Sequence, residues 1–221
     1  MDRQQARRRI DEIGIVPCAR VAIAEQVCFA AKALYAAGIP VLEVTLTFPE
    51  APKVVGEIAR RYPDMAVGAG TVLDEDSARR SIDAGARFIT SPGLVPKVVA
   101  CAKAADVLVI PGALTPTEVI AAWQSGADLV KIFPVAAAGG IHYVHALRAP
   151  LPQVPLIVSG GVNQLTAFDY ILAGASAIGI GGELLPSDAL ARQREDRIHE
   201  LARRFLAMVR EARSQRDANG K

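Results

Sequence analysis

The apolar residues of the chain alternate between short runs rich in Val and Ile and longer stretches in which they recur at helical spacing. The short runs are typical of strands buried beneath helices on both faces. They lie at 14–20, 39–46, 65–70, 86–91, 106–112, 127–133, 155–161 and 175–180. The intervening stretches predict helices at about 22–37, 50–61, 75–84, 94–104, 116–125, 141–148, 164–173 and 188–212.

A glycine recurs where a helix end made of small residues meets the next strand. Gly38, Gly85, Gly126 and Gly174 each follow such an end and precede an apolar run. A residue at this position closes the helix with a positive φ, which glycine adopts without steric cost. Successive glycines are far enough apart for two strand-plus-helix units, so the pattern predicts about eight such units.

Eight alternating units without a long linker predict an α/β protein with a single (β/α)8 TIM barrel. An open doubly wound sheet is the alternative, because the pattern does not reveal strand order. The segment 1–13 predicts an N-terminal helix that closes the barrel floor with Ile10 and Ile13, and a long C-terminal helix packs on the outside. We therefore expect one domain over 1–213 and a polar tail over 214–221.

Composition and charge narrow the class of protein. The chain has 221 residues, of which 51% are apolar, enough for a large core, and this excludes a disordered chain. Lys and Arg number 25 against 23 Asp and Glu, and the net charge of +2 gives no general attraction to nucleic acid or to a membrane. Three widely spaced cysteines favour reduced thiols, and no signal peptide or membrane span is indicated. We expect a soluble protein of the cytoplasm.

Two charged residues, Glu43 and Lys131, lie well inside apolar strands. Burial of an ammonium group lowers its pKa, so we expect Lys131 to supply a neutral amine that attacks a carbonyl and forms a Schiff base. A carboxylate in the same cavity could carry protons to and from the imine, which is the role expected for Glu43. The alternative is a structural ion pair, or a lysine that reaches out to solvent at the strand end.

Glycine-rich loops follow the last two predicted strands, at 159–163 and 179–182. Backbone amides in such loops can hold a phosphate, and phosphate sites recur at this place in barrels of this type. The alternative is that the glycines only permit tight turns. His142 and His145 have no neighbouring ligand set, so we expect a surface role for them and no metal site.

Several segments together resemble the class I 2-keto-3-deoxy-6-phosphogluconate (KDPG) aldolases, also called 4-hydroxy-2-oxoglutarate (KHG) aldolases. The segments are EVTLTFPEA (43–51), VGAGTVLD (67–74), FITSPGL (88–94), IPGALTPTE (110–118), VKIFP (130–134) and GGVN (160–163). The resemblance implies a homotrimeric (β/α)8 lyase that cleaves KDPG to pyruvate and glyceraldehyde 3-phosphate, with no metal or other cofactor. It also implies cleavage of KHG to pyruvate and glyoxylate and a place in the Entner–Doudoroff pathway. The C4 epimer, 2-keto-3-deoxy-6-phosphogalactonate, is an alternative substrate.

The resemblance also implies roles for individual residues. Lys131 looks like the Schiff-base lysine and Glu43 like the general acid/base. The residues that match the substrate-binding positions are Thr71, Ser91 and Pro92 for the pyruvate carboxylate, Phe133 beside the imine, and Ser159, Gly160, Gly161, Gly181 and Gly182 for the phosphate. Thr47 stands where some members have an arginine, so we expect Arg20 to take over recognition of the carboxylate.

Other phosphate-binding barrels remain as alternatives. A protein similar to thiamine-phosphate synthase or to a phosphosugar isomerase would use the glycine loops without needing Lys131. A non-catalytic phosphosugar-binding barrel would need neither charged residue, and the presence of both Glu43 and Lys131 argues against it.

Overall fold

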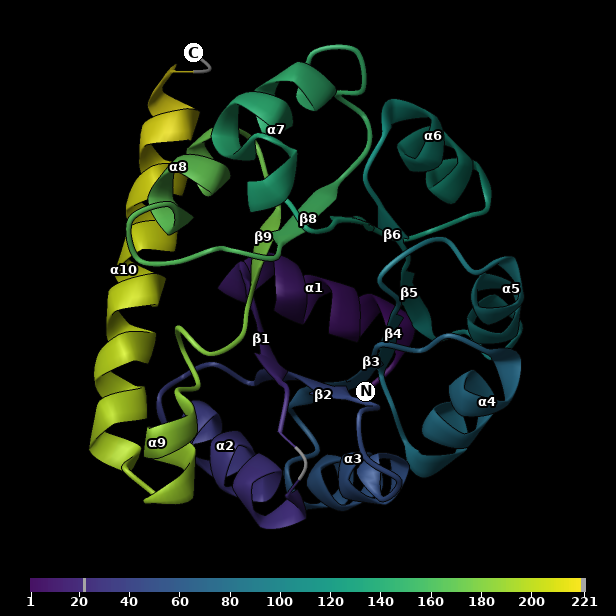
Figure 1. Cartoon of the computed structure of the whole chain (residues 1–221), viewed down its shortest axis with the longest axis vertical. Helices are drawn as coiled ribbons and strands as arrows, with labels where there is room; N and C mark the ends of the chain where they lie inside the picture. The colour runs from purple at the N-terminus through teal and green to yellow at the C-terminus, as the bar shows by residue number, and fades with distance from the viewer. Residues whose placement is uncertain (22, 220–221) are drawn as a thin grey trace.

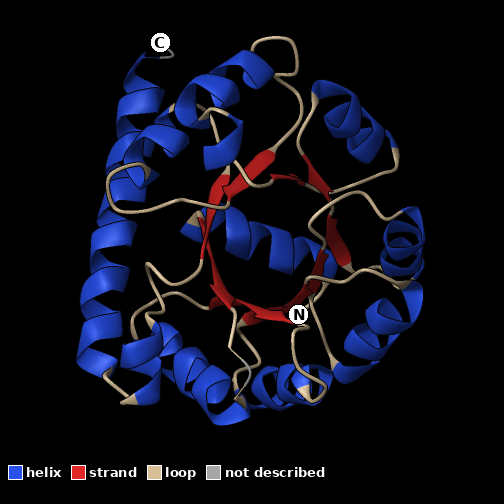
Figure 2. Ribbon diagram, viewed as in Figure 1, coloured by secondary structure: helices blue, strands red, loops and turns tan. Residues whose placement is uncertain are grey.

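Parallel strands form a nearly closed ring that is surrounded by helices (Figures 1 and 2). The structure is a computed structural model that describes residues 1–21 and 23–219. The order around the ring is β5-β4-β3-β2-β1-β9-β8-β7-β6. The strands are β1 (Ile15–Ala19), β2 (Val41–Thr45), β3 (Ala66–Gly70), β4 (Phe88–Thr90), β5 (Leu108–Ile110), β6 (Gly112–Ala113), β7 (Val130–Ile132), β8 (Leu156–Ser159) and β9 (Ala177–Ile180). Sequential neighbours pair in parallel, so the predicted TIM-barrel fold is confirmed.

The strands β5 and β6 are two halves of one predicted strand, separated by Pro111. Proline has no N–H to donate to a ladder, which interrupts the strand at this residue. Its carbonyl still accepts a hydrogen bond of 2.9 Å from the Lys131 N–H, and the Asp128 N–H donates to the Val109 carbonyl at 3.0 Å. These two bonds connect the segment of β5 and β6 to the segment that contains β7. Because β5 and β6 count as one unit, the ring contains the eight strand units that the sequence predicts.

The helices lie close to their predicted positions. They are α1 (Arg3–Ile13), α2 (Ala24–Ala36), α3 (Ala51–Arg61), α4 (Glu75–Ala84), α5 (Pro96–Ala104), α6 (Pro116–Gln124), α7 (Gly140–Arg148), α8 (Ala167–Leu172), α9 (Ser187–Ala191) and α10 (Glu195–Asn219), with a short 3-10 helix at Ala136–Ala138. Gly38, Gly85, Gly126 and Gly174 follow helices with φ values of 81°, 115°, 90° and 101°. The prediction of positive φ at these glycines is confirmed. None of the helices in the described ranges is long and apolar enough to cross a membrane.

The helix α1 lies across one end of the ring (Figure 2) and contacts β2, β3, β5 and β9. Ile10 is fully buried, and Ile13 packs partly buried beside it. Ile10 belongs to a cluster that fills the barrel at this end, together with Val16, Val41, Ala66, Phe88, Leu108, Ile110, Leu129, Ile157 and Ala177. The prediction that this helix closes the barrel floor is confirmed.

The end of the chain differs from the prediction in two ways. The single helix expected over 188–212 is two helices, because the chain turns between α9 and α10, where Gln193 has a φ of 50°. The segment 214–221, expected as a polar tail, is helical as far as Asn219, where α10 ends, and residues 220–221 lie outside the described residues.

Arginine contacts explain why the last turns of α10 stay helical. Arg213 donates to the carbonyls of Glu12 (2.9 Å) and Ser176 (3.0 Å), and Arg216 donates to that of Ile171 (3.4 Å). These long side chains attach the polar end of the helix to the barrel, which apolar periodicity alone does not reveal.

Candidate active site

The carboxyl ends of β1, β7, β8 and β9 surround a cavity of about 270 Å³. Chemistry in barrels of this type gathers at this end, opposite the floor that α1 closes. The cavity is lined by Cys18, Arg20, Lys131, Phe133, Ser159, Gly160, Gly161, Val162, Gly179, Gly181, Gly182 and Glu183. It brings together eight of the predicted site residues: Arg20, Lys131, Phe133, Ser159, Gly160, Gly161, Gly181 and Gly182.

Lys131 and Glu43 meet inside the ring, where Nζ lies 3.6 Å from Oε2. Only 7% of Lys131 and 3% of Glu43 is exposed. Alternation along the strand explains the inward direction of Lys131, because its neighbours Val130 and Ile132 belong to the core outside the ring. Leu42 and Val44 belong to the same outer core and flank Glu43 in the same way. The two charges that stand out in the sequence therefore form one buried pair.

The pairing reverses the expected direction of the pKa shift at Lys131. Burial is the largest influence and lowers the pKa of Lys131, but attraction to the Glu43 carboxylate is part of what outweighs it, so the pKa lies above its ordinary value. The prediction of a lowered pKa was wrong because it considered the apolar neighbours without the carboxylate at 3.6 Å. In the resting protein the pair is an ammonium and a carboxylate, and a neutral amine requires transfer of one proton.

Cys18 is a site residue that the sequence analysis missed. It lies on β1 in register with Glu43, lines the cavity, and is 8% exposed. Burial is the main reason that its pKa is raised well above the ordinary value, so the side chain remains a thiol. The available signal was its inward position on the strand, because cysteine in apolar sequence otherwise looks like an ordinary core residue.

Glu43 is held from two further strands. The Thr90 hydroxyl on β4 donates a hydrogen bond of 2.8 Å to Glu43 Oε2. A Cβ added to Gly70 on β3 would collide with Glu43 Oε1, so the bare glycine backbone leaves room for the carboxylate. Neither residue was predicted as part of the site.

The wall beside the lysine is formed by Phe133 and the loop after β8. The Lys131 ammonium lies 5.4 Å from the centre of the Phe133 ring, within the range of a cation–π contact. Gly160 and Gly161 have φ values of 88° and 90°, and a side chain at Gly161 would collide with Ala136. The glycines therefore permit the tight turn and also bring backbone to the cavity, so both readings of the loop agree with its geometry.

Four predicted contact residues do not line this cavity. Thr47 shares a hydrogen bond of 3.1 Å with Thr45, and the buried Ser91 hydroxyl donates to the Gly93 carbonyl at 2.6 Å. Pro92 follows Ser91, while Thr71 follows β3 with a positive φ of 61°. All four lie after the carboxyl ends of β2, β3 and β4, on the side of the ring from which Glu43 projects. Their role in binding the substrate stays a prediction.

Arg20 and Glu183 place opposite charges on the cavity. Arg20 also lines an adjoining cavity of about 320 Å³, which shares Cys18 and Gly182 with the first and extends to Asp188. Glu183 follows the glycine loop after β9 and was not predicted as a site residue. Glu183 directly follows Gly181 and Gly182, at the end of the cavity where the sequence predicts a phosphate.

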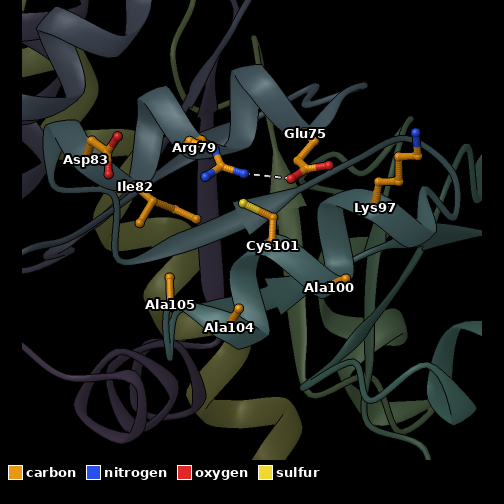
Figure 3. A pocket seen from close by; sticks show the side chains of 9 residues that line it. All are labelled: Glu75, Arg79, Ile82, Asp83, Lys97, Ala100, Cys101, Ala104 and Ala105. Atoms are coloured by element: carbon orange, nitrogen blue, oxygen red, sulfur yellow. Dashed lines mark hydrogen bonds and ion pairs between the residues drawn. The ribbon is translucent and has the colours of Figure 1, made fainter.

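A larger cavity of about 450 Å³ lies outside the ring between α4 and α5 (Figure 3). Arg79 in this cavity is paired with Glu75 at 2.7 Å, and Cys101 faces the same space. Burial raises the pKa of the Cys101 thiol, which favours the unreactive form. The buried pair of opposite charges is at the strand ends instead, so we place the candidate active site there.

No group of three or more His, Cys, Asp or Glu residues within 1–21 and 23–219 is arranged to hold a metal ion. His142 and His145 are exposed on α7, as the sequence predicts.

Comparison with known proteins agrees with this geometry. The family model described as KDPG and KHG aldolase matches residues 7–201. The KHG/KDPG aldolase of Escherichia coli (strain K12) is 38% identical over 190 residues, which is 86% of this chain and 89% of that protein. The 2-dehydro-3-deoxy-phosphogluconate aldolase of Dickeya dadantii is 37% identical over 178 residues, or 80% of this chain and 83% of that protein.

A solved structure of similar fold carries a covalent intermediate. It is the KDPG aldolase of Legionella pneumophila with pyruvate captured as a carbinolamine, at 32% identity and a TM-score of 0.82, covering 88% of this chain and 94% of that chain. The match of the family model over most of the barrel, with relatives above 30% identity, shows that this chain belongs to the KDPG and KHG aldolase family, whose named members are lyases.

Proposed function

We propose that the protein is a class I aldolase that cleaves a 4-hydroxy-2-oxo acid and releases pyruvate through a Schiff base on Lys131. The observation that carries this proposal is the buried contact of 3.6 Å between Glu43 Oε2 and the Nζ of Lys131, which lines the cavity. KDPG, which would give glyceraldehyde 3-phosphate as the second product, is the substrate we propose. Its C4 epimer and KHG, which would give glyoxylate, share the same reacting carbons.

The proposed reaction begins with a proton transfer within the pair. Glu43 takes a proton from the Lys131 ammonium, and the neutral amine adds to the C2 ketone. Glu43 returns a proton as the C2 oxygen leaves as water, which gives a protonated imine on Lys131. Loss of the C4 hydroxyl proton to Glu43, through a bound water, then breaks the C3–C4 bond. The aldehyde departs, and the electron pair moves into the imine to form an enamine.

The remaining steps regenerate the enzyme. The enamine takes the proton back from Glu43 at C3, and water hydrolyses the resulting protonated imine to pyruvate and the Lys131 ammonium. Because the protonated imine accepts the electron pair of the broken bond, the proposed reaction uses no metal and no other cofactor. The proposal also keeps the homotrimer implied by the family, with small oxo acids as the only other partners.

The residues that line the cavity support one orientation of the substrate, with its carboxylate and its phosphate bound by different residues. Arg20 is its cation apart from Lys131 and is the residue we propose for the carboxylate end. Ser159 and the glycines Gly160 and Gly182 line the same cavity, and we propose that the tail phosphate binds to the Ser159 hydroxyl and the glycine backbone. Remote binding of that phosphate would position the C4 hydroxyl for deprotonation.

The Glu183→Gln substitution tests where the tail phosphate of the substrate binds. Removing a carboxylate beside the proposed phosphate should lower the KM for KDPG about two- to fivefold, the range expected for one exposed charge pair. The KM for 2-keto-3-deoxygluconate, which is the same substrate without its phosphate, should not change. Glu211→Gln, which removes an exposed charge on α10, is the matched control. Equal effects on both substrates would place the phosphate elsewhere.

Reductive trapping tests the proposed function itself. Borohydride added with pyruvate should attach one reduced pyruvyl group to the protein, and peptide mass analysis should find it on Lys131. The exposed Lys97 serves as an internal control and should stay unmodified. Labelling of another lysine, or no pyruvate-dependent labelling, would contradict the Schiff base.

A further inference from the structure

A buried hydroxyl contacts the carboxylate of the proposed catalytic pair. Thr90 is 2% exposed at the end of β4, and its Oγ1 lies 2.8 Å from Glu43 Oε2. A carboxylate has no proton to give, so Thr90 donates this hydrogen bond. The same Oε2 atom lies 3.6 Å from Lys131 Nζ. One oxygen of Glu43 is therefore shared between a fixed neutral donor and the proposed nucleophile.

The second oxygen of the carboxylate is confined as well. Gly70 on β3 leaves a space that Oε1 occupies, and any side chain there would collide with it. A glutamate side chain has several rotatable bonds and would otherwise sample other conformers. Because Thr90 is β-branched, few rotamers are open to its first side-chain torsion, and its hydroxyl is therefore held in one position. Thr90 and Gly70 together select the orientation that points Oε2 toward Lys131.

Packing alone does not explain a threonine at this position. A buried hydroxyl is costly unless it is bonded, and valine would fill nearly the same space with no polar group. In the described parts of the chain the Thr90 hydroxyl makes its hydrogen bond to Glu43. The neighbours Phe88 and Ile89 on the same strand are apolar and fully buried. The presence of the Thr90 hydroxyl is therefore explained by its hydrogen bond to the Glu43 carboxylate.

We propose that Thr90 is a positioning residue, which holds Oε2 of Glu43 in reach of Lys131. This inference rests on the proposed aldolase reaction and adds a residue to it. The charged and titratable groups around the buried pair are Cys18 on β1 and Arg20 at the end of β1. The Cys18 thiol is also a neutral donor, but its hydrogen bond goes to the Val16 carbonyl at 3.5 Å.

Thr90→Val tests the proposal. Loss of one hydrogen bond to a charged group should lower kcat about 10- to 100-fold, while KM changes less than about threefold because Thr90 lies behind Glu43. Thr90→Ser restores a hydroxyl and should recover most of kcat.

Controls separate positioning from stability. Ser81→Ala removes another buried hydroxyl, whose 2.8 Å bond goes to the Ser77 carbonyl on α4, and should leave kcat unchanged. If Thr90→Val does not fold, Thr90→Ala removes the same hydroxyl, and the comparison with Thr90→Ser gives the same test.

The outcomes distinguish this inference from the proposed function. A wild-type protein that forms no pyruvyl adduct on Lys131 would refute the Schiff-base reaction. An adduct on the wild type, with Thr90→Val turning over within about twofold of it, would overturn the role of Thr90 alone. A Thr90→Ser variant as slow as Thr90→Val would also overturn it, because the hydroxyl would then not be the cause.

Discussion

Lys131→Ala is expected to reduce pyruvate release by at least about 10⁴-fold, because the covalent route disappears with the amine. No other lysine lines the cavity, and the described chain offers no second amine there. The rate is measured by a coupled pyruvate assay with KDPG. The same variant should form no borohydride-trapped adduct with pyruvate.

Lys131→Arg provides the matched control for this prediction. The guanidinium keeps a positive charge opposite Glu43 but forms no Schiff base, so the loss of rate should be as large as in Lys131→Ala. Stability should differ between the two, because Lys131→Ala leaves the Glu43 carboxylate buried without its partner, which costs on the order of 3 kcal/mol. Pyruvate release by Lys131→Arg at a rate near that of the wild type would contradict the mechanism.

Glu43→Gln is expected to lower kcat by about 10²- to 10⁴-fold, the contribution typical of a positioned acid/base group. The amide has nearly the same shape and can still accept a hydrogen bond from Thr90, so the fold should be kept. It cannot take the proton from the Lys131 ammonium or from the C4 hydroxyl. Unchanged turnover would reduce Glu43 to a structural partner of Lys131.

The same substitution has a second consequence for pH dependence. In the wild type the carboxylate helps to raise the pKa of Lys131 above its ordinary value, although burial acts in the opposite direction. Without Glu43, burial remains as the largest influence, and the pKa of Lys131 falls. Pyruvate trapping by Glu43→Gln should therefore persist to lower pH than trapping by the wild type, while cleavage stays slow. A trapping profile with an unchanged acidic limb would contradict this account.

The features that could be predicted from the sequence are each marked by a short sequence pattern. Gly85 and Gly174 stand out because a helix end needs a positive φ, and the barrel follows from their repetition. Lys131 and Glu43 stand out because a charge inside an apolar strand is rare. Each of these signals is contained in a few consecutive residues, so it needs no knowledge of the folded chain.

The features that could not be predicted depend on contacts between distant strands. Thr90, Cys18 and Glu183 belong to residue types that are ordinary at their positions, and only the arrangement of the ring brings them to Glu43 or to the cavity. The direction of the Lys131 pKa shift depends on one distance, 3.6 Å, between residues on β7 and β2. No sequence pattern contains that distance.

The helix α1 also has a consequence for the order of events in the proposed reaction. The cluster around Ile10 fills one end of the barrel, and within the described residues the cavity lies at the opposite end, at the carboxyl ends of the strands. After the carbon–carbon bond breaks, the three-carbon fragment is still tethered to Lys131 in the cavity, whereas the aldehyde is free. The aldehyde must therefore leave first, and its departure lets water reach the imine and release pyruvate. Pyruvate should accordingly behave as a competitive inhibitor toward the intact substrate.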